Sequence, residues 1–136
     1  MSQLLINIDV PDIDVGVSFY VNGLGFTLVR TLFEKSVAEL VLGQATVYLI
    51  EQAEETKPFP AASRPRTYER HWTPVHLDVV VADMSAALEK AIAAGATRSG
   101  GTTTHDWGTL TPLSDPFGHG VCLLQFSPAG YDAVAE

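Results

Sequence analysis

Residues 10–26, VPDIDVGVSFYVNGLGF, contain the boundary between a strand and a helix, and they decide how the first half of the chain folds. Apolar residues alternate over residues 4–10, which predicts a half-buried strand. Asp12 is a good N-cap for a helix over residues 13–21, where apolar side chains recur every four positions. Asn22-Gly23 is expected to end this helix, because both residue types accept left-handed backbone geometry.

Three strands are predicted to follow the helix. Residues 26–33 are rich in β-branched and aromatic side chains, and residues 37–42 and 45–51 are similarly apolar. Gly43-Gln44 is expected to form the tight turn between the last two strands. Residues 53–74 then break the pattern with four prolines, so we interpret them as a connector.

The same order of elements repeats in the second half of the chain. A strand over residues 75–81 precedes Asp83, which is a second N-cap, and an alanine-rich helix over residues 84–94 is expected to end at Gly95. A threonine-rich loop or strand is expected to reach Asp106. Three further strands are predicted near residues 96–100, 109–113 and 121–126, followed by a loose tail from Gly130.

A nearly constant offset relates the two halves. Val10-Pro11-Asp12 corresponds to Val81-Ala82-Asp83, 71 positions later, and Val47 corresponds to Val121, 74 positions later. The sequence therefore predicts a single α+β domain over residues 1–136, made of two βαβββ modules. The modules and their linkage are expected at about residues 4–52, 53–74 (the connector) and 75–127.

Composition and charge limit the classes of partner. The net charge of −8 opposes nucleic-acid binding, which requires a basic surface, and it would attract a cationic ligand. Solubility alone also explains an acidic surface. A single cysteine excludes a disulfide within the chain. No basic leader or long apolar stretch is found, so we expect a cytoplasmic protein without a membrane partner.

Several short motifs occur in a characteristic order. They are Val10-Pro11-Asp12-Ile13, Phe19-Tyr20, Leu24-Gly25-Phe26, Pro74-Val75-His76-Leu77-Asp78 and Asp115-Pro116-Phe117-Gly118-His119-Gly120. Together they resemble the vicinal-oxygen-chelate superfamily, which includes glyoxalase I, bleomycin-resistance proteins, fosfomycin-resistance enzymes and extradiol dioxygenases. The resemblance covers the chain from about Leu4 to Phe126. It implies two curled mixed sheets around a cleft, and a homodimer.

The resemblance also indicates where a divalent metal would be bound. Its metal-dependent members carry His or Gln, Glu, His and Glu on the first and last strands of the two modules. The matching positions in this chain are Leu5, Tyr48, His76 and Cys122, and only His76 fits the pattern. Leucine cannot donate to a metal, and tyrosine is protonated near neutral pH. No cofactor is therefore predicted, and the usual divalent ion is not expected.

Other polar residues have both functional and structural interpretations. His76 and Asp78 are expected on one face of a strand, where Asp9 could join them in an oxygen-rich site. Alternatively, both aspartates are polar groups hydrogen-bonded to their neighbours. Cys122 is either a small buried apolar residue or a nucleophile activated by His76. Trp72 and Trp107 are candidate contact surfaces for flat or cationic ligands, although Trp107 fits the core equally well.

These observations favour a glyoxalase/bleomycin-resistance-like protein that binds a small organic molecule, cationic or aromatic, without the usual metal. The predicted ligand-binding residues are Tyr48, His76, Asp78, Trp107 and Cys122, and no catalytic residue is assigned. The alternative is a lyase or dioxygenase-like enzyme with an atypical site around His76.

Overall fold

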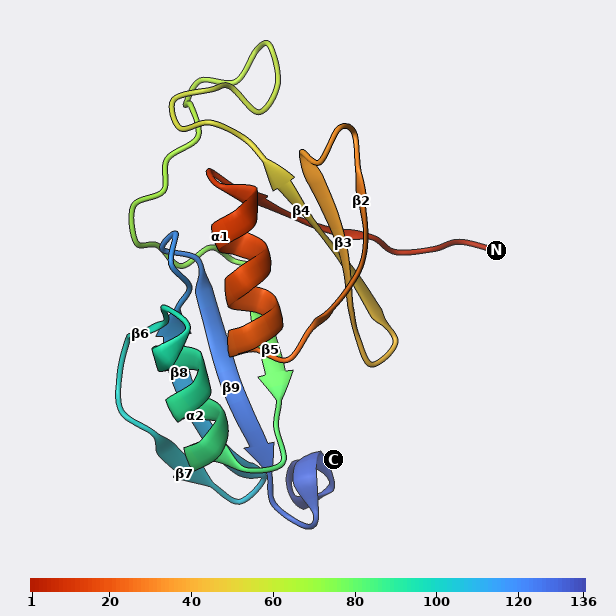
Figure 1. Cartoon of the computed structure of the whole chain (residues 1–136). Coiled ribbons are helices and arrows are strands. Elements are labelled where there is room, and N and C mark those ends of the chain that lie inside the picture. The colour runs from red at the N-terminus through yellow and green to blue at the C-terminus, as the bar shows by residue number, and fades with distance from the viewer. The chain divides into compact units, whose positions relative to one another are not determined.

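Two units make up the structure, Met1–Glu69 and Arg70–Glu136, in a computed structural model that describes all 136 residues (Figure 1). Each unit contains one mixed sheet and one principal helical segment, which is the α+β class predicted from the sequence. None of the helices has the length and apolar character needed to cross a lipid bilayer.

The first unit has a four-stranded sheet in the order β1-β4-β3-β2. Strands β1 and β4 are parallel, and β2, β3 and β4 are antiparallel neighbours. The parallel pair requires the crossover through a helix that the sequence predicts. The elements are β1 (Ile6–Val10), α1 (Ile13–Ser18) with a continuing π-helix (Phe19–Gly23), β2 (Thr27–Leu32), β3 (Val37–Leu42) and β4 (Ala45–Glu51).

The second unit repeats this plan with one additional short strand. Its sheet has the order β5-β9-β8-β6, in which β5 and β9 are parallel, and β7 pairs with β8. The elements are β5 (Leu77–Val80), α2 (Met84–Ala93), β6 (Thr97–Arg98), β7 (Thr103–His105), β8 (Gly108–Ser114), β9 (Gly120–Phe126) and a 3-10 helix (Gly130–Val134). The threonine-rich segment therefore forms a strand.

Both helices begin where the sequence predicts. The Asp12 carboxylate accepts a hydrogen bond from the Val15 amide at 3.0 Å, and the Asp83 carboxylate accepts one from the Ala86 amide at 3.1 Å. Each bond satisfies one of the free amides in the first turn of a helix. Gly95, with φ +122°, ends the second helix as expected.

The end of the first helix differs from the prediction at Asn22-Gly23. The chain continues through a π-turn to Gly23, and the left-handed residue is Gly25, with φ +83°. The Gly25 amide donates to the Val21 carbonyl at 3.2 Å, and the Phe26 amide donates to the Tyr20 carbonyl at 3.0 Å. The wider turn accommodates two more residues before the helix closes.

Some predicted boundaries are also corrected. The strand expected over residues 75–81 is limited to Leu77–Val80, and the first strand begins at Ile6 rather than at residue 4. The tail from Gly130, expected to be loose, forms a short 3-10 helix. It is held because the Tyr131 ring packs against Phe126, with ring centroids 4.8 Å apart.

Alternation along the strands separates a core face from an open face in each sheet. In the first unit, Leu49 and Val10 point to the α1 side, where a side chain added at Gly16 would lie 3.2 Å from Leu49 and 3.4 Å from Val10. In the second unit, Val79 and Leu123 are buried, while their strand neighbours Asp78 and Cys122 occupy the opposite face. The open faces carry the polar residues described next.

Candidate functional site

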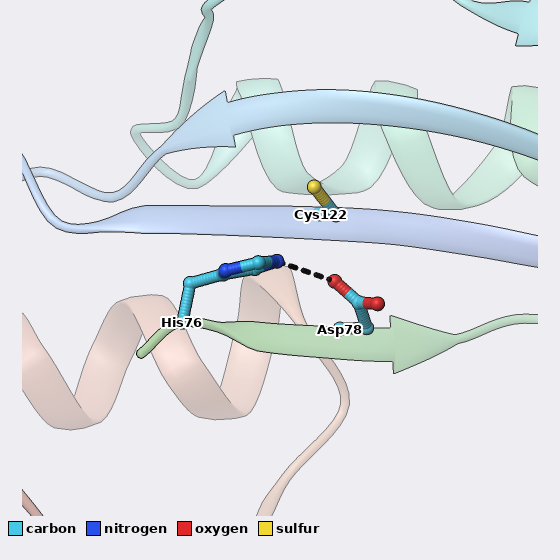
Figure 2. Close-up of side chains that lie close together, drawn as sticks. All are labelled: His76, Asp78 and Cys122. Atoms are coloured by element: carbon cyan, nitrogen blue, oxygen red, sulfur yellow. Dashed lines mark ion pairs between the residues drawn. The ribbon is translucent and has the colours of Figure 1, made fainter. Parts of the chain in front are cut away.

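Three side chains meet on the open face of the second sheet. Asp78 on β5 and Cys122 on β9 are paired residues of neighbouring parallel strands, so they project on the same side. His76 precedes Asp78 by two residues, and its Nε2 lies 3.2 Å from the Asp78 Oδ1. One donor atom from each of the three residues lies within 4.8 Å of the others (Figure 2).

The Cys122 thiol is held in its protonated form. Burial raises the pKa of this thiol to about 11, and the negative charge of Asp78 and a hydrogen bond to its carboxylate act in the same direction. A thiolate, not a thiol, is the nucleophile in cysteine chemistry. The His76 ring nitrogen lies within 4.8 Å of the sulfur, but the negative Asp78 carboxylate beside the thiol opposes formation of a thiolate. The arrangement therefore gives no support to an activated nucleophile.

Trp72 covers the beginning of β9 on the same face. A side chain at Gly120 would lie 2.7 to 2.9 Å from three atoms of the indole ring, so the ring rests directly on the glycine backbone. The edge of the ring packs against His76 in a T-shaped arrangement, with centroids 5.1 Å apart. Trp72 remains 45% exposed. One large aromatic surface is thus presented to solvent beside His76.

The segment that carries Trp72 is fastened to the turn before β9. The His71 amide donates to the Gly118 carbonyl at 3.0 Å, and the His71 Nε2 lies 3.0 Å from the His119 Nδ1. The His71 Nδ1 is buried and has no hydrogen-bond partner. Burial, followed by the nearby His119, lowers the pKa of His71. This segment is therefore best held when His71 is neutral.

The turn itself is organised by a buried carboxylate. Asp115 is 3% exposed, and its Oδ1 accepts hydrogen bonds from the amides of Phe117 and His119 at 2.8 and 2.9 Å. The Asp115-to-Gly118 segment, part of the Asp115-to-Gly120 motif, forms the turn between β8 and β9. Its rigidity fixes His119, and through His119 it fixes the position of His71.

In the first unit, Tyr48 belongs to a different polar network. Its hydroxyl donates to Glu39 Oε1 at 2.9 Å, and the Arg30 guanidinium contacts the same oxygen at 3.1 and 3.2 Å. The hydrogen bond from Tyr48, more than Arg30, lowers the pKa of Glu39. The same hydrogen bond raises the pKa of Tyr48. The phenol is therefore a donor, not a metal ligand.

The remaining first-unit candidates are also accounted for. Leu5 precedes β1 and is exposed. Asp9 accepts a 2.7 Å hydrogen bond from the Arg66 guanidinium, with which it forms an ion pair. This favours the interpretation of Asp9 as a hydrogen-bonded structural group over a member of an oxygen-rich metal site.

Trp107 lies at the other end of β9 from Trp72. Its ring stacks on His105, with centroids 4.7 Å apart and planes 4° from parallel, and it contacts Tyr131. Its carbonyl accepts a hydrogen bond from the Ser127 amide. The structure therefore brings together His76, Asp78 and Cys122 of the predicted ligand-binding residues, but it does not bring Trp107 to them.

Two participants were missed by the sequence analysis. Gly120 permits the close approach of Trp72, and Glu39 binds the hydroxyl of Tyr48. An isolated glycine at the start of an apolar strand is a known signal of close backbone approach, so Gly120 could have been identified. Glu39 lies nine residues from Tyr48 across a hairpin turn, and cross-strand pairing of residues 37–42 with 45–51 would have indicated the contact.

The residues at the four metal-ligand positions do not form the divalent-metal centre that the fold implies. Leu5 offers no donor atom, Tyr48 is engaged with Glu39, and Cys122 stands where the pattern has a glutamate. Only His76 has the chemistry that the pattern requires. No chemical step that depends on a four-ligand centre can be assigned to this chain.

Two mixed sheets, each closed by a parallel pair of first and last strands, define an α+β protein of duplicated βαβββ architecture. The sequence model for the glyoxalase-like domain matches residues 5–124. The chain therefore belongs to the glyoxalase-like domain family, within the superfamily that its motifs resemble. A search of curated proteins gave no significant match.

Solved structures with the same fold are distant in sequence. A glyoxalase-related enzyme from Fulvimarina pelagi has a TM-score of 0.70 and 15% identity, over 92% of this chain and 88% of its own. A glyoxalase/bleomycin resistance protein/dioxygenase family enzyme from Burkholderia phytofirmans PsJN has a TM-score of 0.69 and 18% identity, over 90% and 97%. TioX from Micromonospora sp. ML1 has a TM-score of 0.63 and 20% identity, over 93% and 97%. These likenesses concern the fold.

Proposed function

We propose that this chain binds a small organic molecule, aromatic or cationic, on the open face of the second sheet, without the four-ligand divalent-metal centre. The observation that carries the proposal is the position of Trp72. Its indole ring rests on Gly120 and packs against His76, and 45% of the residue is still exposed. An exposed aromatic ring held in one position is a preorganised surface on which a ligand can stack.

A fixed indole lowers the cost of binding. A free tryptophan loses rotational freedom when a ligand stacks on it, and that loss subtracts from affinity. Trp72 is already restrained by the sheet below it and by the bonds of His71 to Gly118 and His119. Stacking of a flat ligand would therefore keep more of its contact energy.

Charge favours a cation on this surface. Asp78 lies near His76 with an exposed carboxylate, and the chain carries a net charge of −8. A cation over an indole face gains about 0.5–2 kcal/mol from the ring quadrupole alone. The nearby carboxylate adds an attraction that salt would screen. A flat aromatic cation satisfies both features.

The enzymatic alternative has weaker support. A nucleophilic role for Cys122 would need a thiolate at neutral pH, and the pKa of about 11 opposes this. His76 is paired with Asp78 and Trp72, which explains its position without a catalytic role. Ligand binding accounts for the same residues with fewer requirements.

A binding experiment with matched variants tests the proposal. The probe is a methylacridinium cation, with neutral acridine for comparison, titrated into the chain carrying Trp107→Phe so that Trp72 is the only indole. We expect quenching of Trp72 fluorescence, loss of affinity by at least tenfold in Trp72→Ala measured by calorimetry, and selective weakening of the cation in Asp78→Asn. The protein is stripped of metal with a chelator before the titration; the cation should still bind, and added salt should weaken its binding.

Two results would contradict different parts of the proposal. Binding that survives Trp72→Ala would refute this surface as the site, and a metal-stripped chain that binds the cation only after metal is added would show that a metal is required. The Trp107→Phe substitution is also the positional control, because this residue lies at the far end of β9. The wild-type chain and Trp107→Phe should bind the cation equally.

The proposal includes a cytoplasmic location and a homodimer. The one cysteine is a free thiol, which accords with a reducing compartment. Sedimentation equilibrium of the purified chain measures the oligomeric state directly. A monomer at all concentrations would contradict the dimer without affecting the binding proposal.

A further inference from the structure

The triad of His76, Asp78 and Cys122 lies wholly within the second unit. Its donor atoms are a ring nitrogen, a carboxylate oxygen and a sulfur, all within 4.8 Å of one another, and the nitrogen and oxygen are already 3.2 Å apart (Figure 2). Ligands of a tetrahedral zinc ion lie about 3.3–3.6 Å from one another, given metal–ligand bonds of about 2.0–2.3 Å. Side-chain rotations that move the donor atoms by about 1 Å would bring their separations from at most 4.8 Å to the range of a zinc site.

The choice of donors selects the metal. Magnesium and calcium require sets of oxygen ligands, and the triad has only one carboxylate. Zinc accepts cysteine, histidine and aspartate together, and a thiolate favours it over hard ions. A metal also replaces the proton of a coordinating thiol, so a protonated Cys122 in the free protein is compatible with ligation.

The three residues of the triad differ in their exposure to solvent. Cys122 is 5% exposed and forms the floor, whereas the side chains of His76 and Asp78 are 39% and 38% exposed. An ion can therefore reach the sulfur between the two outer ligands. Three protein ligands with one accessible position is the arrangement of an open zinc site rather than a closed structural one.

Neighbouring contacts hold two of the ligands in place. The Trp72 ring packs against His76, and strand pairing fixes Asp78 opposite Cys122. Groups that orient ligands in this way strengthen metal binding. We propose that His76, Asp78 and Cys122 form a three-ligand zinc site within the second unit, replacing the two-module centre that the fold implies. The proposal does not depend on binding of an organic molecule.

Metal titration of the full-length chain tests this site. The chelator-stripped protein is titrated with zinc by calorimetry and with cobalt(II) by absorption spectroscopy. We expect one ion per chain and a sulfur-to-cobalt charge-transfer band in the near ultraviolet. Cys122→Ser should abolish the band, Asp78→Asn should lower zinc affinity at least tenfold, and magnesium should not compete.

A matched control is His105→Ala, which removes an exposed histidine of the same unit that lies outside the triad. It should bind zinc like the wild type. Thermal unfolding supplies a second measurement: zinc should raise the Tm of the wild type and of His105→Ala, and not that of Cys122→Ser. This comparison is valid for any variant whose circular dichroism shows a folded chain.

Three results would overturn the site. They are cobalt binding without a thiolate band, zinc affinity unchanged by Asp78→Asn, and less than one ion per ten chains at saturating zinc. Organic-ligand binding is measured in chelator-treated protein, so a failed zinc titration leaves that experiment intact, and loss of acridinium binding leaves the zinc result intact.

Discussion

Replacing Gly120 by alanine tests the contact on which the binding surface depends. The added Cβ would lie 2.7, 2.8 and 2.9 Å from three atoms of the Trp72 ring, whereas carbon atoms in contact prefer about 3.5–4.0 Å. Gly120 does not have a left-handed φ, so alanine suits the backbone itself. The indole must therefore shift by about 1 Å or leave the sheet.

The size of the effect follows from the area involved. A tryptophan side chain buries roughly 200 Å² when fully covered, and Trp72 is 45% exposed, so about 110 Å² is at stake. At about 25 cal/mol per Å², complete release of the ring costs about 3 kcal/mol, and a partial shift costs about 1 kcal/mol. Alanine restricts the unfolded chain and recovers about 0.5–1 kcal/mol. The expected net destabilisation is about 2–2.5 kcal/mol if the ring is released and at most about 0.5 kcal/mol if it only shifts.

Urea unfolding followed by far-ultraviolet circular dichroism measures this difference. Gly101→Ala is the matched control, because a side chain there meets nothing within 4 Å, and it should raise stability by the same amount, about 0.5–1 kcal/mol. In a Trp72→Ala background, Gly120→Ala should likewise raise stability by about 0.5–1 kcal/mol. Equal destabilisation in both backgrounds would show that the indole is not the group displaced, and the reasoning would fail.

Three further predictions concern other residues. The pKa of His71 is lowered from 6.5, so the unfolded chain binds this proton more readily; stability should be full above about pH 6.5 and fall as the pH drops below it. The Tm should fall between about pH 7.5 and 5.5. This fall should be smaller in His71→Gln than in the wild type, and unchanged in His105→Gln. Lys35 is the last of three successive non-glycine residues with positive φ, at +69°, so Lys35→Gly should raise the unfolding free energy by about 0.5–1 kcal/mol in urea, and a decrease would contradict the strain. Cys122, with a pKa of about 11, has several hundred-fold less thiolate near neutral pH than free cysteine at about 8.5, so iodoacetamide should modify the metal-free thiol at least a hundredfold more slowly, and Asp78→Asn should accelerate the reaction; a rate equal to that of free cysteine would disprove the protonated state.

Local signals in the sequence predicted most of the fold. Asp12 and Asp83 begin their helices as expected because an N-cap is decided by residues only three positions away. Strands β3 and β4 have the predicted bounds, since the Gly43 turn fixes the hairpin between them. The predicted end of the first helix was wrong because the π-turn depends on the packing of the buried Phe19 and Tyr20, and not on Gly23.

The site was only partly predictable. Period-two geometry correctly placed His76 and Asp78 on one face, but the pairing of Asp78 with Cys122 depends on the register of two strands separated by the whole module. The contact of Trp72 with Gly120 joins residues 48 positions apart. Contacts of this kind arise from tertiary packing, and a connector rich in prolines gives no periodic signal of where it will lie.

The parallel pairing of β1 with β4 has a consequence for biosynthesis. Strand β1 ends at Val10, and its partner β4 is complete only at Glu51. On the ribosome, β1 therefore emerges first and waits with unpaired backbone groups until about forty more residues have been made. An unpaired apolar edge can associate with another nascent chain. Translation through β2 and β3 is thus the interval in which aggregation competes with closure of the first sheet, before any strand of the second exists.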